Sequence, residues 1–252
     1  MSHEQMTVME HLDELRKRLF GVAIFFVVAL IGSFFIAPTF ITYLQQSPEA
    51  SALTLNAFRM TDPFKVYIQM TIFLACVVTA PLILFQLWAF ISPGLYEKER
   101  RVTLSYIPMS VLLFLGGLSF SYFVLFPFVV DFMMTLSGNM EVQTTIGINE
   151  YFSFLFQLTL PFGFLFQLPI VMLFLTRLGI VTPMFLASIR KYAYFTLLVI
   201  AAFITPPDIM SHILVTLPLC VLYEISIVIS RFGYKKAMEA EQQQELEQKS
   251  DL

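Results

Sequence analysis

The chain contains few charged residues, because Asp, Glu, Lys and Arg together make up only 13% of its 252 residues. Hydrophobic residues make up 58%, and the mean hydropathy is +0.77. A soluble protein needs more polar surface than this, whereas lipid can cover the apolar remainder. The composition therefore excludes an ordinary soluble domain and predicts an integral membrane protein.

Cysteine and histidine are also scarce. Both cysteines lie inside apolar runs, where we expect them to pack as small hydrophobic residues. The three histidines are too scattered for a metal site, and neither a phosphate-binding loop nor a serine-protease elbow is present. No basic stripe stands clear of the apolar segments, which argues against nucleic acid as a partner. We therefore expect neither an enzyme nor a protein with a metal or cofactor.

Six apolar segments are candidate transmembrane helices. A helix of about 20 residues spans a bilayer core, and the first four segments meet that length. The fifth segment, about 12 residues and roughly 18 Å long, falls short of a core of about 30 Å. Two alternatives explain the short fifth segment equally well. Either the helix is longer and has a polar end starting near Arg190, or the bilayer is locally thinned beside it. The segments are 19–37, 66–91, 104–130, 152–175, 193–204 and 213–229.

The basic residues predict the orientation. All but two of the 15, Arg59 and Lys65, lie on the side of the membrane that carries both termini when six segments cross it. The positive-inside rule therefore places both termini in the cytoplasm. We expect residues 1–232 to form a single six-span domain in the cell membrane and residues 233–252 to form a polar cytoplasmic tail. The composition of that tail suggests a poorly ordered segment.

Prolines lie inside or at the ends of several predicted spans. Each removes a backbone donor and tends to bend its helix, so we expect an all-α, cupped bundle with several bent helices. The stretch Thr205-Pro206-Pro207-Asp208 should interrupt the helix between the last two spans. The six prolines in or beside the spans are Pro81, Pro108, Pro127, Pro161, Pro169 and Pro218.

A charged cluster, HLDELRKRL at residues 11–19, stands before the first span. Asp13 and Lys17, like Glu14 and Arg18, have the i,i+4 spacing of helical ion pairs. An interfacial amphipathic helix explains this spacing, and composition alone favours that interpretation. It does not explain why acids gather on the side that faces anionic lipid. A basic peptide partner would explain them.

A second charged cluster, SPGLYEKERR at residues 92–101, follows the second span. One interpretation is local charge neutralisation. The other is that Glu99 stays available to a guanidinium from outside, since a carboxylate pairs with that group in a bidentate manner. Apolar neighbours, including Phe90 and Leu95, would then dock an adjoining hydrophobic side chain.

Three polar residues lie deeper in the apolar segments. Glu224, within the sixth span, is either a functional ionisable group or a helix-end carboxylate near the cytoplasmic interface, and the sequence supports both equally. Asp208 is expected to cap the sixth span after the Pro-Pro turn. Gln167, in the fourth span, is positioned to hydrogen-bond a neighbouring helix in this chain or in a partner.

Seven motifs then follow one another in the order typical of a single family. From about His11 to Arg231 the chain closely resembles TatC, the six-span receptor subunit of the twin-arginine protein translocase. Several stretches, among them LTLNAF and IGINEYF, look most like the TatCy form of Gram-positive bacilli. The motifs are HLDELRKRL, PLILFQLWAFISPGLYEKERR, SYFVLFPFVVDF, FGFLFQLPIVMLFLTRLGIVTP, RKYAYF, ITPPD and LPLCVLYEISI.

The resemblance implies a function and partners. TatC proteins recognise consecutive arginines in the signal peptides of folded precursors, and the proton-motive force drives transport. TatA-type single-span proteins assemble around the receptor, which we expect to be a homo-oligomer within the complex, with the fifth span as a docking region. The family's arginine-contacting acids match Glu14 and Glu99. Other positions that match its signal-peptide-binding motifs are Arg16, Phe90, Pro93 and Leu95.

One position departs from the family pattern. Many members carry glutamate where this chain has Gln167. An amide does not titrate, so the departure argues against an obligate proton-carrying role there and leaves a hydrogen-bonding role. Asp208 matches the family's TPPD position. The alternative function is a proton-coupled small-solute transporter that uses Glu224 and Asp208.

Overall fold

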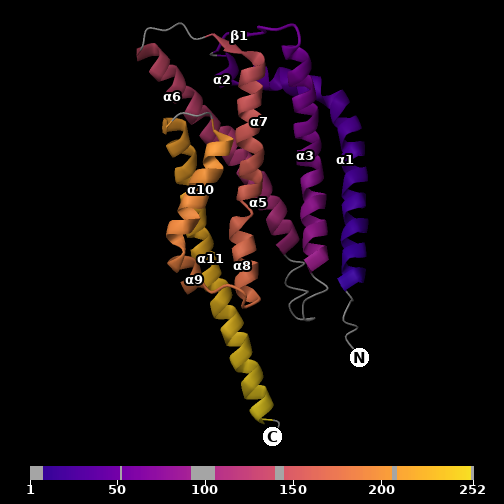
Figure 1. The fold of residues 1–252 in the computed structure, drawn as a ribbon, viewed down its shortest axis with the longest axis vertical. Helices are drawn as coiled ribbons and strands as arrows, with labels where there is room; N and C mark the ends of the chain where they lie inside the picture. Colours follow the sequence, from indigo (N-terminus) through magenta and orange to yellow (C-terminus); the bar gives the residue numbers. More distant parts are fainter. Residues whose placement is uncertain (1–7, 52, 92–105, 140–144, 206–208, 251–252) are drawn as a thin grey trace. The chain divides into compact units, whose positions relative to one another are not determined.

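The computed structural model describes residues 8–51, 53–91, 106–139, 145–205 and 209–250. Nearly all of these residues are helical (Figure 1). The chain divides into two compact units, one formed by Met1–Leu112 and Val130–Phe156 and the other by Leu113–Val129 and Gln157–Leu252. We call them unit 1 and unit 2 and describe each by itself.

Unit 1 is built around two long helices, α1 (Val8–Gln45) and α3 (Asp62–Ile91), which pack side by side (Figure 1). Apolar surroundings offer no hydrogen-bond partners to the backbone N–H and C=O groups of these helices. A helix satisfies these groups within one segment. The Tyr67 hydroxyl on α3 donates to the Phe34 carbonyl on α1 at 2.6 Å, and the two rings meet edge to face. The buried Asp62 carboxylate accepts the Arg59 N–H at 2.8 Å, where α3 begins.

A short parallel strand pair corrects the all-helical expectation. Strand β1 (Leu55–Asn56) pairs with β2 (Ile146–Gly147), with Leu55 opposite Ile146 and Asn56 opposite Gly147. A short helix, α2 (Pro48–Ser51), precedes β1. Two-residue strands carry too little alternation to be recognised in a sequence, so this pairing depends on the tertiary structure.

The third predicted span is longer than expected and contains a π-helical turn. It consists of α5 (Tyr106–Phe120), η2 (Ser121–Leu125) and α6 (Phe126–Asn139). The Phe126 N–H donates to the Ser121 carbonyl, five residues earlier. Pro127 follows directly and has no N–H to offer, so the wider turn lets the chain continue as a helix past it.

The fourth predicted span is interrupted. Two residues separate helix α7 (Ile148–Leu165) from α8 (Leu168–Arg177). Pro169, in the first turn of α8, has no N–H, which is tolerated at a helix start but not in a helix interior. Gln167 caps the new helix, and its carbonyl accepts the N–H groups of Ile170 and Val171 at 3.1 and 3.0 Å.

The rest of unit 2 consists of α9 (Pro183–Ser188), α10 (Arg190–Ile204) and α11 (Ile209–Ser250). Helix α11 packs against α8, α9 and α10. The predicted interruption at residues 205–208 separates α10 from α11. Thr205 is extended, as the residue before a proline prefers.

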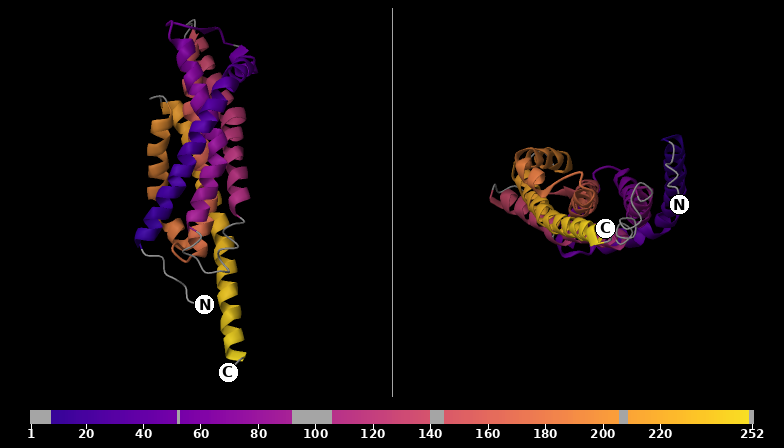
Figure 2. Two further views of the ribbon diagram at one scale, coloured as in Figure 1. Left: turned by 90° about the vertical axis from the view of Figure 1, so that its right-hand side faces the viewer. Right: turned by 90° about the horizontal axis from the view of Figure 1, so that it is seen from below.

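The predicted tail is wrong in one respect. Helix α11 continues without a break to Ser250 and runs well past α9, as Figure 1 and the left view of Figure 2 show. The segment is polar, as expected, but it is not irregular. It is rich in Glu, Gln and Lys, which have high helix propensity, and contains no proline or glycine after Gly233.

Within the described residues, five helical stretches are long and apolar enough to cross a membrane. They are Leu12–Gln45, Asp62–Phe90, Tyr106–Gly138, Ile148–Arg177 and Ser211–Lys235. Helix α10 is the predicted fifth span. It starts at Arg190, where the polar-end interpretation places it, yet its 15 residues extend only about 22 Å. The proline bends and the cupped arrangement stay predictions.

Candidate functional site

The first candidate site lies in unit 1, where Arg18 joins α1 to α3. Its Nε donates to Glu14 Oε1 at 2.9 Å, and its Nη2 donates to the same oxygen. Its Nη1 donates to Gln86 Oε1 on α3 at 2.8 Å. We call these three residues the Arg18 cluster. It confirms the predicted i,i+4 pairing of Glu14 with Arg18 and adds Gln86, which the sequence reading missed.

Helical spacing explains how the Arg18 cluster forms. Residues four apart lie on one helix face, so Glu14 and Arg18 point the same way from α1. The side chains of Arg18 and Glu14 are 25% and 21% exposed, so the pair is half-buried rather than fully hydrated. Phe90 lies one turn beyond Gln86 on α3 and is also half-buried. The structure thus places Phe90 on the same helix face as an arginine-binding amide.

The other predicted signal-peptide residues fall elsewhere. Arg16 Nη2 lies 3.1 Å from Asp13 Oδ1, and both side chains are mostly exposed. Arg16 is two residues from Glu14 and therefore lies on a different face of α1. Pro93, Leu95 and Glu99 lie outside the described residues, so their roles stay predictions.

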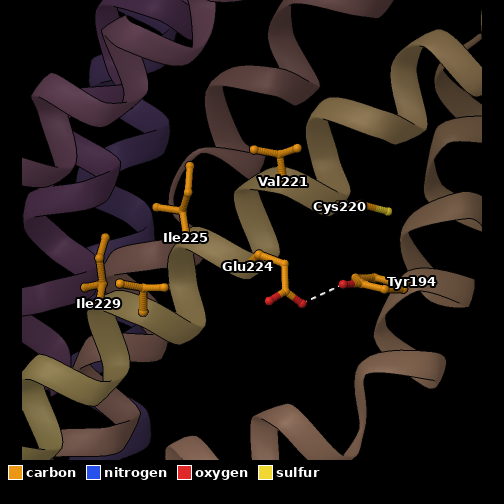
Figure 3. Close-up of a pocket in the computed structure, with 7 residues that line it drawn as sticks. Tyr194, Cys220, Val221, Glu224, Ile225 and Ile229 are labelled. Atoms are coloured by element: carbon orange, nitrogen blue, oxygen red, sulfur yellow. Dashed lines mark hydrogen bonds between the residues drawn. The ribbon is translucent and has the colours of Figure 1, made fainter.

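The second candidate site lies in unit 2, between α10 and α11. Arg190 Nε donates to Glu224 Oε1 at 2.7 Å, and Arg190 Nη2 donates to Glu224 Oε2 at 2.9 Å. The Tyr194 hydroxyl donates to Glu224 Oε1 as well (Figure 3). We call these three residues the Glu224 cluster. The carboxylate accepts three hydrogen bonds, two of them in the bidentate arrangement that favours a guanidinium.

The structure does not place Glu224 at a helix end, because α11 continues past it to Ser250 and the apolar stretch Ser211–Lys235 includes it. Glu224 lies about four turns into α11, and Arg190 lies about four turns before the end of α10. The chain reverses between these helices, so the two residues meet at the level where α10 begins. A pocket of about 490 Å³ opens beside Glu224 (Figure 3). Its lining is Tyr194, Cys220, Val221, Glu224, Ile225, Val228 and Ile229.

The remaining predicted polar residues are not brought into either cluster. Gln167 is 8% exposed and sits at the break between α7 and α8. Asp208 lies outside the described residues, so its capping role stays a prediction. The described residues contain no group of three or more His, Cys, Asp or Glu side chains that could hold a metal ion.

The sequence contained a signal for one of the missed residues. Gln86 is an isolated polar residue within the apolar run PLILFQLW, and such a residue in a span is a functional candidate. No comparable signal in the sequence indicated that Arg190 and Tyr194 would contact Glu224. They lie 34 and 30 residues from it along the chain, too far for a local spacing rule to connect them.

Comparison with known proteins matches most of the chain to one family. The family described as "Sec-independent protein translocase protein (TatC)" matches residues 10–218. TatCy of Bacillus subtilis (strain 168) is 64% identical over 95% of this chain and 94% of its own length. TatCd of the same organism is 41% identical over 96% of this chain and 98% of its own length. A crystal structure of the twin-arginine translocase receptor TatC matches with a TM-score of 0.81 at 33% identity, covering 89% of this chain and 99% of that one.

Proposed function

The chain belongs to the TatC family of Sec-independent protein translocases, and we propose that it is the receptor subunit that binds twin-arginine signal peptides of folded precursors. The solved relatives are named as twin-arginine translocase receptors. The chain is a multi-pass membrane protein of this translocase.

The observation that carries this proposal is that Glu14 already binds a guanidinium. Two N–H groups of Arg18 donate to its carboxylate, and the side-chain amide of Gln86 accepts a third. A charge-assisted contact of this kind is stronger than a neutral hydrogen bond and is geometrically selective for arginine. An arginine of a signal peptide presents the same group. Glu14, together with Glu99 in its predicted role, would therefore supply the two carboxylates that an arginine pair needs.

The arrangement in the membrane follows from the same proposal. The five long apolar stretches each cross the membrane, and the shorter α10 crosses it as well, between the fourth and the last of them. An even number of crossings, six, leaves both termini on one side of the cell membrane. The distribution of basic residues makes that side the cytoplasm. TatA-type single-span partners, homo-oligomerisation within the complex and transport driven by the proton-motive force complete the proposal. It assigns this subunit no catalytic chemistry.

Site-specific crosslinking tests the residue assignment. A photoreactive signal peptide with two arginines should crosslink to the full-length protein in membranes, and Glu14→Ala/Glu99→Ala should lose most of this crosslinking. Asp13→Ala is a matched control, because Asp13 is an exposed acid adjacent to Glu14 and pairs only with Arg16 among the contacts described. Retained crosslinking in the double variant, at normal membrane levels, would refute the assignment.

The alternative function, a proton-coupled small-solute transporter, gains nothing from the geometry. It requires Glu224 to exchange protons with a substrate pathway. Glu224 is instead held by a bidentate contact with Arg190 and a hydrogen bond from Tyr194. The protein reconstituted alone should therefore move no small solute, and measurable flux would revive the alternative.

A further inference from the structure

The Arg18 cluster offers the guanidinium more hydrogen-bond acceptors than a simple ion pair would. Three of the five N–H groups of Arg18 have acceptors, and these acceptors come from two helices. Glu14 supplies charge from α1, while Gln86 supplies a neutral amide oxygen from α3. A carboxylate alone attracts lysine as well as arginine. The added amide oxygen is what distinguishes a planar fork of donors from a single ammonium.

The contact between Arg18 and Glu14 lies within one helix. Both residues lie on α1, so Arg18 can leave Glu14 by a change of rotamer without any movement of a helix. Both side chains are reachable from outside, at 25% and 21% exposure. Replacing one guanidinium by another also keeps a cation beside the half-buried carboxylate throughout, which avoids the cost of an unpaired charge.

We propose that Gln86 is a specificity-determining residue that reads a guanidinium, and that Arg18 occupies this position until an arginine of the signal peptide replaces it. The inference rests on the proposed function, since it names how the same site is selective and what fills it at rest. Gln86 accepts an N–H that lysine cannot present in the same geometry while also contacting Glu14. Arg18 is a resident competitor that lowers the apparent affinity for the peptide.

A peptide-binding experiment separates the role of Gln86 from a structural one. The full-length protein in liposomes is titrated with a fluorescent twin-arginine peptide and with the same peptide carrying two lysines. Gln86→Leu, which keeps the volume but lacks the acceptor, should weaken arginine-peptide binding about tenfold, the scale of one hydrogen bond to a charged group. Lysine-peptide binding should stay unchanged. Gln69→Leu is the matched control, because Gln69 lies on α3 but bonds Ser153 instead.

The second arm tests Arg18 as a competitor. If Arg18 holds the cluster about 90% of the time, its removal in Arg18→Gln should tighten arginine-peptide binding about tenfold. Arg18→Lys keeps the positive charge beside Glu14 but cannot fill both acceptors, so it should tighten binding to a smaller extent. Thermal unfolding of each variant shows that the compared proteins are folded.

The outcomes distinguish this inference from the proposed function. If the wild-type protein does not prefer arginine over lysine peptides, both the proposed function and the inference fail. If the wild type prefers arginine and Gln86→Leu prefers it equally, only the inference fails. Equal weakening of both peptides by Gln86→Leu, or weaker arginine-peptide binding in folded Arg18→Gln and Arg18→Lys, also overturns the inference.

Discussion

The Arg18 cluster of unit 1 and the Glu224 cluster of unit 2 pair the same two chemical groups in different ways. Arg18 reaches Glu14 within one helix and uses a single carboxylate oxygen. Arg190 reaches Glu224 across two helices, 34 residues apart, and uses both oxygens. The first pair can separate without moving a helix, whereas separating the second would loosen α10 from α11. If a signal-peptide arginine replaces Arg18 as proposed, the same chemistry serves exchange in one place and attachment in the other.

Burial does not explain the difference between the clusters. Arg190 and Glu224 are 40% and 39% exposed, more than Arg18 and Glu14. The two pairs differ instead in which elements they connect. The Arg18–Glu14 contact lies within α1, although Arg18 also bonds Gln86 on α3, whereas the Arg190–Glu224 contact joins two helices. If one pair is exchangeable and the other attaches two helices, variants of the two clusters should differ in whether they impair peptide binding or stability.

The largest effect is expected from Glu224→Ala. This change removes three hydrogen bonds from the α10–α11 contact and leaves Arg190 without its bidentate partner. We expect the midpoint of thermal unfolding in detergent to fall by about 5–10 °C. Binding of the twin-arginine peptide by folded protein should stay unchanged.

The control for Glu224→Ala is Asp13→Ala, which removes an exposed ion pair in unit 1. Such pairs contribute little, so the midpoint should shift by no more than about 1–2 °C. If Glu224→Ala instead left stability intact and impaired peptide binding, the attaching role of the Glu224 cluster would be wrong.

A somewhat smaller effect is expected from Gly117→Ala, which tests whether unit 2 also depends on close helix packing. An added Cβ at Gly117 would lie 2.6 Å from the Phe162 carbonyl oxygen, and a backbone atom cannot move aside as a flexible side chain can. We expect the unfolding midpoint to fall by about 3–6 °C.

Gly116→Ala provides the matched control, because an added Cβ there meets nothing within 4 Å. Alanine has the higher helix propensity, so this variant should be as stable as the wild type or slightly more stable. Gly117 shares no described partner with Glu224, so the two destabilisations should add in the double variant. Strong non-additivity would show that the Glu224 cluster and the packing at Gly117 are one coupled unit.

The smallest effect is expected from Tyr194→Phe. It removes one hydroxyl that donates to Glu224 and leaves the bidentate Arg190 contact in place. We expect the midpoint to fall by about 2–3 °C, the scale of a single hydrogen bond. A loss as large as that of Glu224→Ala would mean that Tyr194, rather than Arg190, attaches α10 to α11.

Much of the helical organisation could be predicted from the sequence. Long apolar runs predicted the helices that become α1 and α3, and the Pro-Pro turn predicted the break between α10 and α11. The break at Gln167 and the π-helical turn before Pro127 were missed, although prolines were expected to perturb both spans. Proline shows that a helix must adjust, but its neighbours decide whether the adjustment is a bend, a wider turn or an interruption.

The end of α11 shows a different limit. The polar residues after Lys235 suggested disorder, because such a segment cannot bury apolar surface. Their helix propensity was the better guide, since α11 continues to Ser250. A helix that grows from an existing one needs no new nucleus, so the helix propensity of these residues is enough to extend it.

Local properties of this protein follow from its amino-acid sequence alone: its helices, its membrane class, its family and the i,i+4 pairing of Glu14 with Arg18. These depend on hydropathy and on spacings of a few residues, which are fixed along the chain. Only the tertiary structure placed Gln86 against Arg18, 68 residues away, and Arg190 against Glu224. Side-chain contacts between helices depend on how the helices pack, and that packing is a property of the whole fold.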